Sequence, residues 1–233
     1  MMVSKGIEDI DITIPRDAYN TDKDTPTFNA YLTVVVRDSG GRVVKVHRQR
    51  SHSPTANFIM LMLPLTYFKN TNRSVTINNT GGISYSYKPG IAYNIYDIPY
   101  PNGTVNNPTY LLMIQVGSGS QTNPYSAYSL ASPIANGTGS GQLVYSQPPV
   151  SSNVIASGNS AYFTISQTFN NQSGGTITIT EVGVILNLVL GQSGTTNTTN
   201  IGQVLVWYDV LSSPISVPNG GSVTIYYTFM VNP

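Results

Sequence analysis

The feature that most limits the fold lies in residues 174–231, where apolar and polar residues alternate. Between Thr176 and Thr180 the isoleucines occupy the odd positions and the threonines the even ones, which is the period of a β-strand with one buried and one exposed face. The alternation returns between Ser222 and Val231, close to the end of the sequence. We therefore predict a β-sheet core that includes the C-terminal strand.

The alternation in the first of these strands changes phase at Glu181-Val182-Gly183. After this point the apolar residues take the even positions, beginning with Val182 and Val184. Because successive side chains of a strand point to opposite faces, such a change requires an inserted residue or a turn of the strand onto another face. The sequence therefore predicts a bulge or a sharp bend at residues 181–183.

Composition extends the β prediction to the whole chain. The 233 residues include 16 tyrosines, 15 prolines and 21 glycines, which suit short strands joined by tight turns and do not suit long helices. We predict an all-β protein, a β-sandwich with jelly-roll-like connections, about eight to ten strands and one short helix. Residues 1–27 are interpreted as an N-terminal arm or edge segment, and residues 28–233 as a single β-sandwich domain.

The N-terminal half carries local signals for a hairpin and for the helix. Residues 31–36 have the pattern of a strand, residues 38–41 supply a tight turn, and the chain then returns as a second strand. The helix is predicted over residues 54–63, with Ser53 as its N-cap and Pro64 ending or kinking it.

Further along the chain, residues 110–116 are apolar on both faces and are predicted to form a central strand. Residues 117–142 are rich in Gly, Ser and Asn, and a loop of this length inside a compact domain is usually functional. Shorter strands are predicted at 74–78, 83–87, 93–100, 143–145 and 161–169. The polar stretch 191–200 is predicted to be an exposed tip.

Charge is scarce and unevenly placed. Only 9% of the residues are charged, against roughly 25% in typical soluble domains. All 11 Lys and Arg residues lie at or before Lys88, and residues 89–233 carry only Asp97, Glu181 and Asp209. A surface with few carboxylates changes little with pH, which suits exposure to acid or heat. An amino-acid composition shared by all proteins of the same lineage would explain the low charge equally well. The sequence leaves both explanations, exposure and lineage, open.

A basic run follows the predicted hairpin turn, and it is the candidate assembly contact. Its members are Arg42, Lys45, His47, Arg48 and Arg50. Such a run can contact nucleic acid or anionic lipid. However, alternation places Lys45 and His47 on one face of the strand and the neighbouring valines on the other, and no aromatic stacking pattern accompanies it. A solvated hairpin face or a subunit contact is favoured, and nucleic acid is disfavoured.

No motif predicts a catalytic, cofactor or metal site. The chain has no cysteine, and its two histidines, His47 and His52, lack the spacing of zinc ligands. The glycines of residues 137–141 are not followed by the Lys-Ser/Thr of a phosphate loop. Ser51 stands next to His52, but no acid is placed to complete a triad. We predict a protein that is not an enzyme and that binds no cofactor.

Glu181 stands alone in a hydrophobic strand and admits two interpretations. A catalytic acid in a glycosidase needs a second carboxylate, and only Asp97 and Asp209 are available in this half of the chain. The alternative, a structural carboxylate that accepts backbone N–H bonds at the bulge, is favoured.

No stretch approaches the roughly 18 apolar residues that a transmembrane helix needs, and the first residues lack the apolar region of a signal peptide. If the protein works outside a cell, assembly inside the cell followed by lysis, as for a virus particle, accounts for its release.

Four segments follow a pattern shared with a known group of proteins. They are residues 38–58, 113–146, 163–185 and 213–231. The most specific feature pairs TEVG, at residues 180–183, with a terminal P-x-x-V-x-x-G-x-x-V-T-I-x-Y. Together these segments resemble small β-rich virion structural proteins, associated with capsids, turrets or fibres, of archaeal viruses and tailed phages. Residues 146–157 depart from the pattern and are interpreted as an insertion at a subunit contact.

The resemblance implies a non-enzymatic structural component of a virion: a capsid, vertex or turret, or tail-associated protein that forms homo-oligomers and assembles with other virion proteins. The uncharged composition is similar to that of exterior proteins of viruses that infect thermophilic archaea. A second hypothesis is a host-attachment or carbohydrate-binding module, in which Tyr125, Tyr128 and Tyr96 stack on a host-surface glycan. A third, an enzyme acting on envelope polymers, is disfavoured by the shortage of acids and histidines.

Overall fold

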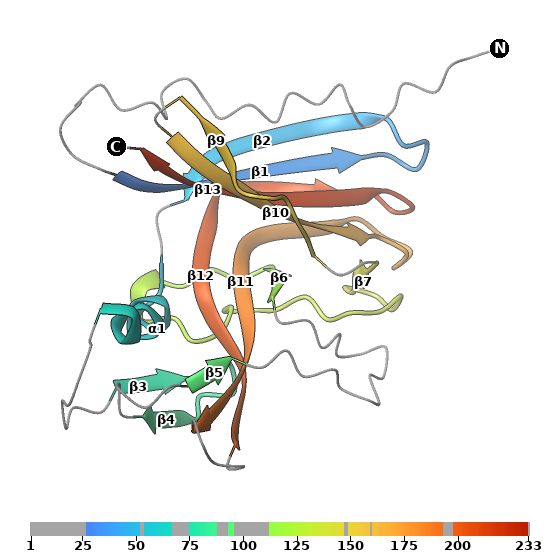
Figure 1. Ribbon diagram of the computed structural model, residues 1–233. Helices are drawn as coiled ribbons and strands as arrows, with labels where there is room; N and C mark the ends of the chain where they lie inside the picture. Colours follow the sequence, from blue (N-terminus) through green and yellow to red (C-terminus); the bar gives the residue numbers. More distant parts are fainter. Residues whose placement is uncertain are drawn as a thin grey trace.

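The computed structural model describes residues 27–51, 54–66, 75–87, 93–95, 112–146, 149–158, 160–192 and 198–232 (Figure 1). The predicted N-terminal arm lies outside these residues except for Thr27, which begins the first strand. This described part of the chain is all-β with one short α-helix, as the sequence predicts.

Sheet A forms one layer and contains both the first and the last strand. Its main path runs in the order β2-β1-β13-β10-β7, and two short strands also pair with β10. The members are β1 (Thr27–Arg37), β2 (Val43–Ser51), β7 (Val144–Tyr145), β8 (Val150–Ser151), β9 (Ile155–Ser157), β10 (Ser160–Asn170) and β13 (Ser222–Asn232). The predicted hairpin, the strand at 161–169 and the C-terminal strand are all confirmed, and the segment at 146–157 supplies β8 and β9.

Sheet B is built on one long hairpin. The hairpin consists of β11 (Ile177–Gln192) and β12 (Thr198–Val217). The other edge of β11 pairs first with β6 (Leu112–Gly117) and further on with β5 (Tyr93–Ile95). A separate hairpin joins β3 (Val75–Asn78) to β4 (Ser84–Tyr87). Of the predicted tip at 191–200, residues 191–192 belong to β11 and residues 198–200 to β12. Residues 193–197 lie outside the described residues.

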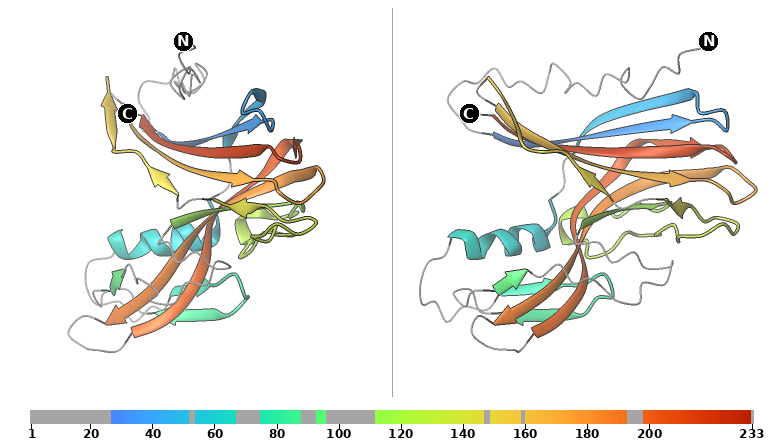
Figure 2. Two further views of the ribbon diagram at one scale, coloured as in Figure 1. Left: turned by 90° about the vertical axis from the view of Figure 1, so that its right-hand side faces the viewer. Right: turned by 45° about the vertical axis from the view of Figure 1, so that its right-hand side comes forward.

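The two sheets pack face to face and enclose the main core (Figures 1 and 2). Leu32 and Val34 of β1 and Tyr227 of β13 face Val182 and Val184 of β11, and all five side chains are buried. The β-sandwich prediction is therefore confirmed. The strand order does not establish the jelly-roll connectivity, which stays a prediction.

The predicted irregularity in β11 is confirmed, but the extra residues lie on its partner. Ile179 pairs with Ile215 and Glu181 pairs with Val210, so residues 211–214 of β12 lie opposite the single residue Thr180. Figure 1 shows the hairpin turning away from the direction of the sandwich strands and running toward α1 and the β3-β4 hairpin. The change of phase in the sequence therefore marks a place where two strands lose their one-to-one register.

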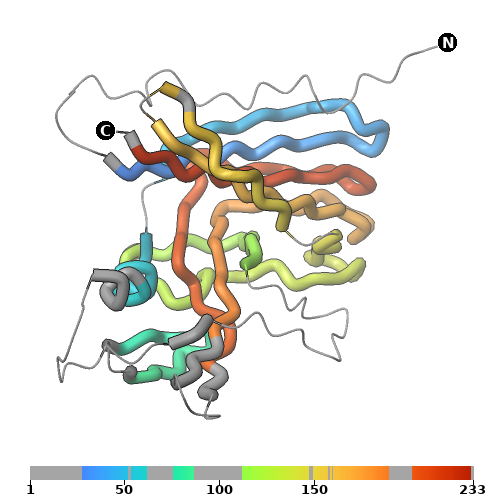
Figure 3. The backbone as a smooth tube through the Cα atoms, viewed as in Figure 1, coloured from blue at the N-terminus to red at the C-terminus, as the bar shows by residue number. Residues whose placement is uncertain are grey.

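β11 is buried on both faces beyond this point, which explains why its alternation is lost. One face packs on sheet A. The other packs under residues 118–142, the long loop, through a second cluster that includes Met113, Ile185, Leu205 and Leu130. Figure 3 shows the chain between β6 and β7 folded beside sheet B. The long loop contains one 3₁₀ turn, η3 (Pro124–Ser126).

The helix α1 (Ala56–Thr66) lies against β12 and β3. It begins two residues later and ends three residues later than predicted. Pro54 forms a bridge with Trp207 of β12, and the Thr55 hydroxyl donates to the carbonyl of Leu205, so these residues belong to the sheet contact and not to the helix. The predicted N-cap Ser53 lies outside the described residues. The helix ends two residues beyond Pro64, since one proline removes only one N–H donor near its last turn.

Candidate functional site

Glu181 on β11 is a fully buried carboxylate that ties the long loop to sheet B. Its Oε1 accepts hydrogen bonds from the N–H of Ser132 at 2.7 Å and of Gly119 at 3.1 Å, and its Oε2 accepts from the N–H of Ala131 at 2.9 Å. The Tyr208 hydroxyl donates to Oε2 at 2.8 Å. The structural interpretation of Glu181 is confirmed, although its donors come from the long loop and from β12 instead of the bulge.

Glycines allow the backbone to approach this carboxylate. A Cβ on Gly117 would lie 2.7 Å from the carbonyl oxygen of Ser132, and one on Gly119 would lie 2.8 Å from the nitrogen of the same residue. On the strand itself, a Cβ on Gly183 would lie 2.6 Å from Cδ1 of Leu205. The glycines in VGSGS and TEVG therefore stand where neighbouring residues leave no space for a Cβ atom.

The Tyr208 hydroxyl links Glu181 to a second point on the loop. It accepts a hydrogen bond from the N–H of Gln121 at 2.7 Å. Burial raises the pKa of Tyr208, and its hydrogen bond to Glu181 raises it further. The phenol therefore stays protonated and remains a donor to the carboxylate.

Asp209 forms a second buried polar cluster on the other face of β12. The Ser51 hydroxyl donates to Asp209 Oδ2, and the Tyr227 hydroxyl donates to the same oxygen at 3.0 Å. The indole N–H of Trp207 donates in turn to the Ser51 oxygen. Burial, and then the charge of Asp209, raise the pKa of Tyr227. The cluster joins β2, β12 and β13 across the sandwich.

The two buried carboxylates do not face a common space. Val182 pairs with Asp209, while Glu181 pairs with Val210. Because neighbouring residues of a strand point to opposite faces, Asp209 points toward sheet A and Glu181 toward the long loop. The arrangement differs from the facing pair of carboxylates that glycoside hydrolysis uses. The third candidate acid, Asp97, lies outside the described residues.

Four of the five residues of the predicted assembly contact lie on β2 and are divided between its two faces, and the fifth, Arg42, lies in the turn before it. Lys45 and His47 share the inner face with Gln49 and meet the irregular part of β12. Lys45 Nζ donates to the carbonyl of Pro214 at 3.0 Å, and Gln49 Oε1 accepts from the N–H of Ser212 at 2.9 Å. These side chains tie the edge of sheet A to sheet B.

The outer face of β2 carries Val46, Arg48 and Arg50. Val44 has no partner at the register shift just before them, and we call these four residues the outer row. The pairing with β1 confirms the predicted separation of Val46 from Lys45 and His47. Val44 is 55% exposed and Val46 is 39% exposed. Arg50 donates to the side-chain oxygen of Asn29 on β1. The fifth predicted residue, Arg42, forms an ion pair at the turn with Asp38, whose pKa it lowers.

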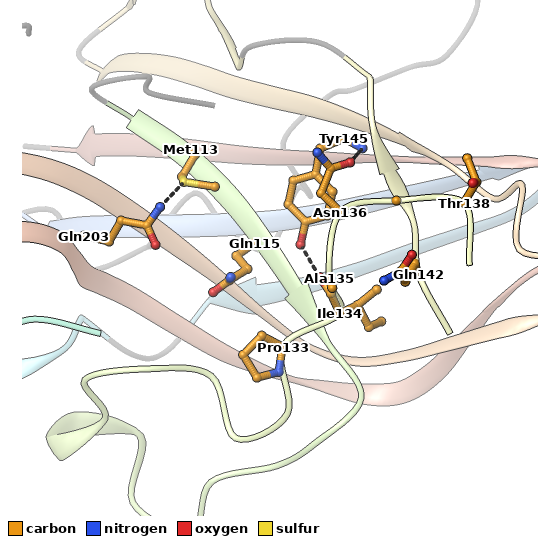
Figure 4. Close-up of a pocket in the computed structure, with 11 residues that line it drawn as sticks. Met113, Gln115, Pro133, Ile134, Ala135, Asn136, Thr138, Gln142, Tyr145 and Gln203 are labelled. Carbon is orange, nitrogen blue, oxygen red and sulfur yellow. Dashed lines mark hydrogen bonds between the residues drawn. The ribbon is translucent and has the colours of Figure 1, made fainter. Parts of the chain in front are cut away.

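A groove of about 790 Å³ opens beside β6 (Figure 4). Met113 and Gln115 of β6 form one part of it, Gln203 of β12 a second, and the end of the long loop, with Asn136 and Gln142, a third. Every residue of the described part of the chain that lines the groove is uncharged. Sequence reasoning missed this site because its residues come from three distant segments.

The tyrosines predicted to contact a glycan are partly described. Tyr125 in η3 is 60% exposed and Tyr128 is 45% exposed, three residues further along the same loop. Tyr128 lies beside Gly82 in the turn between β3 and β4. Tyr96 lies outside the described residues.

Sequence reasoning also missed the Asp209 cluster. The one signal for it was a charged residue inside the apolar run VLVWYDVL. Among the described residues, no group of three or more His, Asp or Glu side chains is placed to hold a metal ion. Within the same part of the chain, no helix is long and apolar enough to cross a bilayer.

Comparison with known proteins adds no relative to this description. No protein-family model, no curated protein and no solved structure matches the chain.

Proposed function

We propose that this protein is a non-enzymatic structural component of the virion of an archaeal virus or a tailed phage. In this proposal it serves as a capsid, vertex or turret, or tail-associated protein that contacts copies of itself and other virion proteins. The resemblance of the four sequence segments and the low charge of the C-terminal two thirds support this role.

The structural observation that carries the proposal is the outer row of β2. Strand β2 stands at the end of the strand order of sheet A. Its two exposed valines, Val44 and Val46, are followed by two arginines that share the face of Val46. An exposed edge strand with apolar side chains is a ready site for pairing with another chain. Arginine is also enriched in protein interfaces, where it packs and donates hydrogen bonds at once.

The uneven charge suggests an orientation in the particle. The charged N-terminal segment and the outer row of β2 would dock onto other virion proteins. The neutral, hydroxyl-rich loops would face outward, where few side chains titrate in acidic surroundings.

The contact is tested by placing charge on the edge strand. The double variant Val44→Lys with Val46→Lys should remain folded and should lose both self-association in sedimentation velocity and incorporation into particles. The control, Ile83→Lys, changes an isoleucine that is 56% exposed in the turn between β3 and β4 and should leave both unchanged. Incorporation of the double variant at the wild-type level would exclude β2 as the assembly contact.

A second candidate function, host attachment or carbohydrate binding, is supported by the exposure of Tyr125 and Tyr128 on one loop. Exposed aromatic rings can pack against the apolar faces of sugar rings and exclude water there. Binding on a glycan array that disappears in Tyr125→Ala and Tyr128→Ala variants supports this function. A protein that binds no glycan on the array does not have it.

A further inference from the structure

We infer that the groove beside β6 is a binding site for an uncharged saccharide. The inference rests on the carbohydrate-binding function proposed above and assigns that function to the groove instead of the exposed tyrosines. The site is defined by Met113, Gln115, Gln142 and Gln203 together with the rim residue Thr138 (Figure 4).

The lining selects a neutral ligand that forms hydrogen bonds. Among the described residues, four amide side chains line the groove and no charged one does: Gln115, Asn136, Gln142 and Gln203. An ionic group that enters without an opposite charge loses hydration that nothing replaces. An amide offers both donors and an acceptor, and a sugar hydroxyl does the same, so the two match in either direction. A purely apolar ligand would cover the Gln115 amide without offering it a hydrogen bond.

Two of the amides have capacity for a ligand. Gln115 is half-buried, and its side chain forms no hydrogen bond with any described residue, so both the side-chain carbonyl and the NH₂ group are available. Gln142 Oε1 accepts from the N–H of Gly139 at 2.9 Å, which fixes the amide and directs its NH₂ group elsewhere. Gly137 and Gly139 carry no Cβ that would collide with this amide. An amide held before the ligand arrives loses less entropy on binding.

The base of the groove is also fixed. Met113 is buried, and its sulfur accepts a hydrogen bond from Gln203 Nε2 at 3.6 Å. The Tyr145 hydroxyl donates to the carbonyl of Ile134 at 2.8 Å, and its ring meets that of Phe169 edge to face. The volume lies within the roughly 300–1,000 Å³ range of small-molecule sites.

Strand addition by a peptide is disfavoured because β6 has no open edge. One edge pairs with β11. On the other edge, the N–H of Ile134 donates to the carbonyl of Val116 at 2.9 Å, and the N–H of Ile114 donates to the side chain of Gln167 at 2.7 Å. A peptide would have to bind through side chains alone, whereas a saccharide needs no strand edge.

The experiment is calorimetric titration of the full chain with uncharged hexasaccharides of glucose, mannose and N-acetylglucosamine. At least one should bind, with a Kd that does not change between pH 4 and pH 8 or with added salt, because no lining group titrates in this range. Gln115→Leu should weaken binding roughly tenfold, which corresponds to one lost hydrogen bond. The control Gln172→Leu, in the exposed turn after β10, should have no effect.

A second groove variant, Thr138→Arg on the exposed rim, keeps the test valid if Gln115→Leu does not fold. Loss of binding in this variant supports the groove. Binding that survives both groove variants but is lost in Tyr125→Ala or Tyr128→Ala overturns the groove assignment and leaves the carbohydrate-binding function standing. Absence of binding by every hexasaccharide overturns both.

Discussion

Replacement of Glu181 by glutamine tests the account of how the long loop is held. The substitution keeps the size of the side chain and removes its charge and one acceptor oxygen. In the wild type, Oε1 accepts from two backbone N–H groups, and Oε2 accepts from one N–H group and from the Tyr208 hydroxyl. If an NH₂ group takes the place of Oε2, it faces the N–H of Ala131, and these two donors cannot form a hydrogen bond. The Tyr208 hydroxyl can rotate and accept a hydrogen bond from the NH₂ group instead.

The expected loss of stability follows from these four bonds. One buried N–H group without an acceptor costs about 1–3 kcal/mol, and the two remaining N–H bonds weaken because their acceptor is no longer charged. The free energy of unfolding should therefore fall by about 3 kcal/mol. For a protein of this size the midpoint of thermal unfolding should fall by about 2–4 °C for each kcal/mol.

Urea unfolding measures this loss, and hydrogen exchange locates it. The amides of Gly119, Ala131 and Ser132 should exchange much faster in the variant, while the amides of β13 should remain the slowest. The comparison variant is Asp38→Asn, which removes a carboxylate at an exposed turn where water can replace it, and its loss should be much smaller. A loss below about 1 kcal/mol for Glu181→Gln, without faster exchange in the loop, refutes the anchoring role.

Three further predictions concern other parts of the core. Gly117→Ala should destabilise the protein by about 2–3 kcal/mol in urea unfolding, since its Cβ would meet the buried glutamate, whereas Gly175→Ala, with open space around it, should be neutral. Ser51→Ala should lower the free energy of unfolding by about 1–3 kcal/mol and, because Ser51 accepts a hydrogen bond from the indole N–H of Trp207, shift the fluorescence of this single tryptophan. An unchanged spectrum would contradict the hydrogen bond between Trp207 and Ser51. Because burial raises the folded-state pKa of Tyr227 above its ordinary value of 10.0, the unfolded chain loses that proton first, and stability should hold to about pH 9 and fall above about pH 10.

Alternation in the sequence was enough to predict the hairpin of β1 and β2, the C-terminal strand β13 and the irregularity near Glu181, but not the short strands β8 and β9. It could not show which strand carries the extra residues, because the register between β11 and β12 depends on both strands and on what packs against them. Residues 211–214 are held by Lys45 and Gln49 of β2, more than 160 positions earlier in the chain. Such a contact leaves no periodic signal in either segment.

The candidate sites were harder to predict for the same reason. The sequence indicated that Glu181 accepts backbone N–H bonds, but the donors lie 49 to 62 residues away in a loop without periodicity. The glycines of VGSGS were the only local sign of a close approach. The groove left no sign, since glutamine and asparagine are common throughout this sequence.

The central claim is that the protein is a structural component of a virion. Quantitative mass spectrometry of particles purified from the culture that carries the gene, through successive density gradients, tests it most directly. The account predicts that peptides of this chain stay with the particles at a fixed ratio to the other particle proteins, in many copies per particle. Particles that contain no peptides of this chain, while the cell fraction does, would contradict the account.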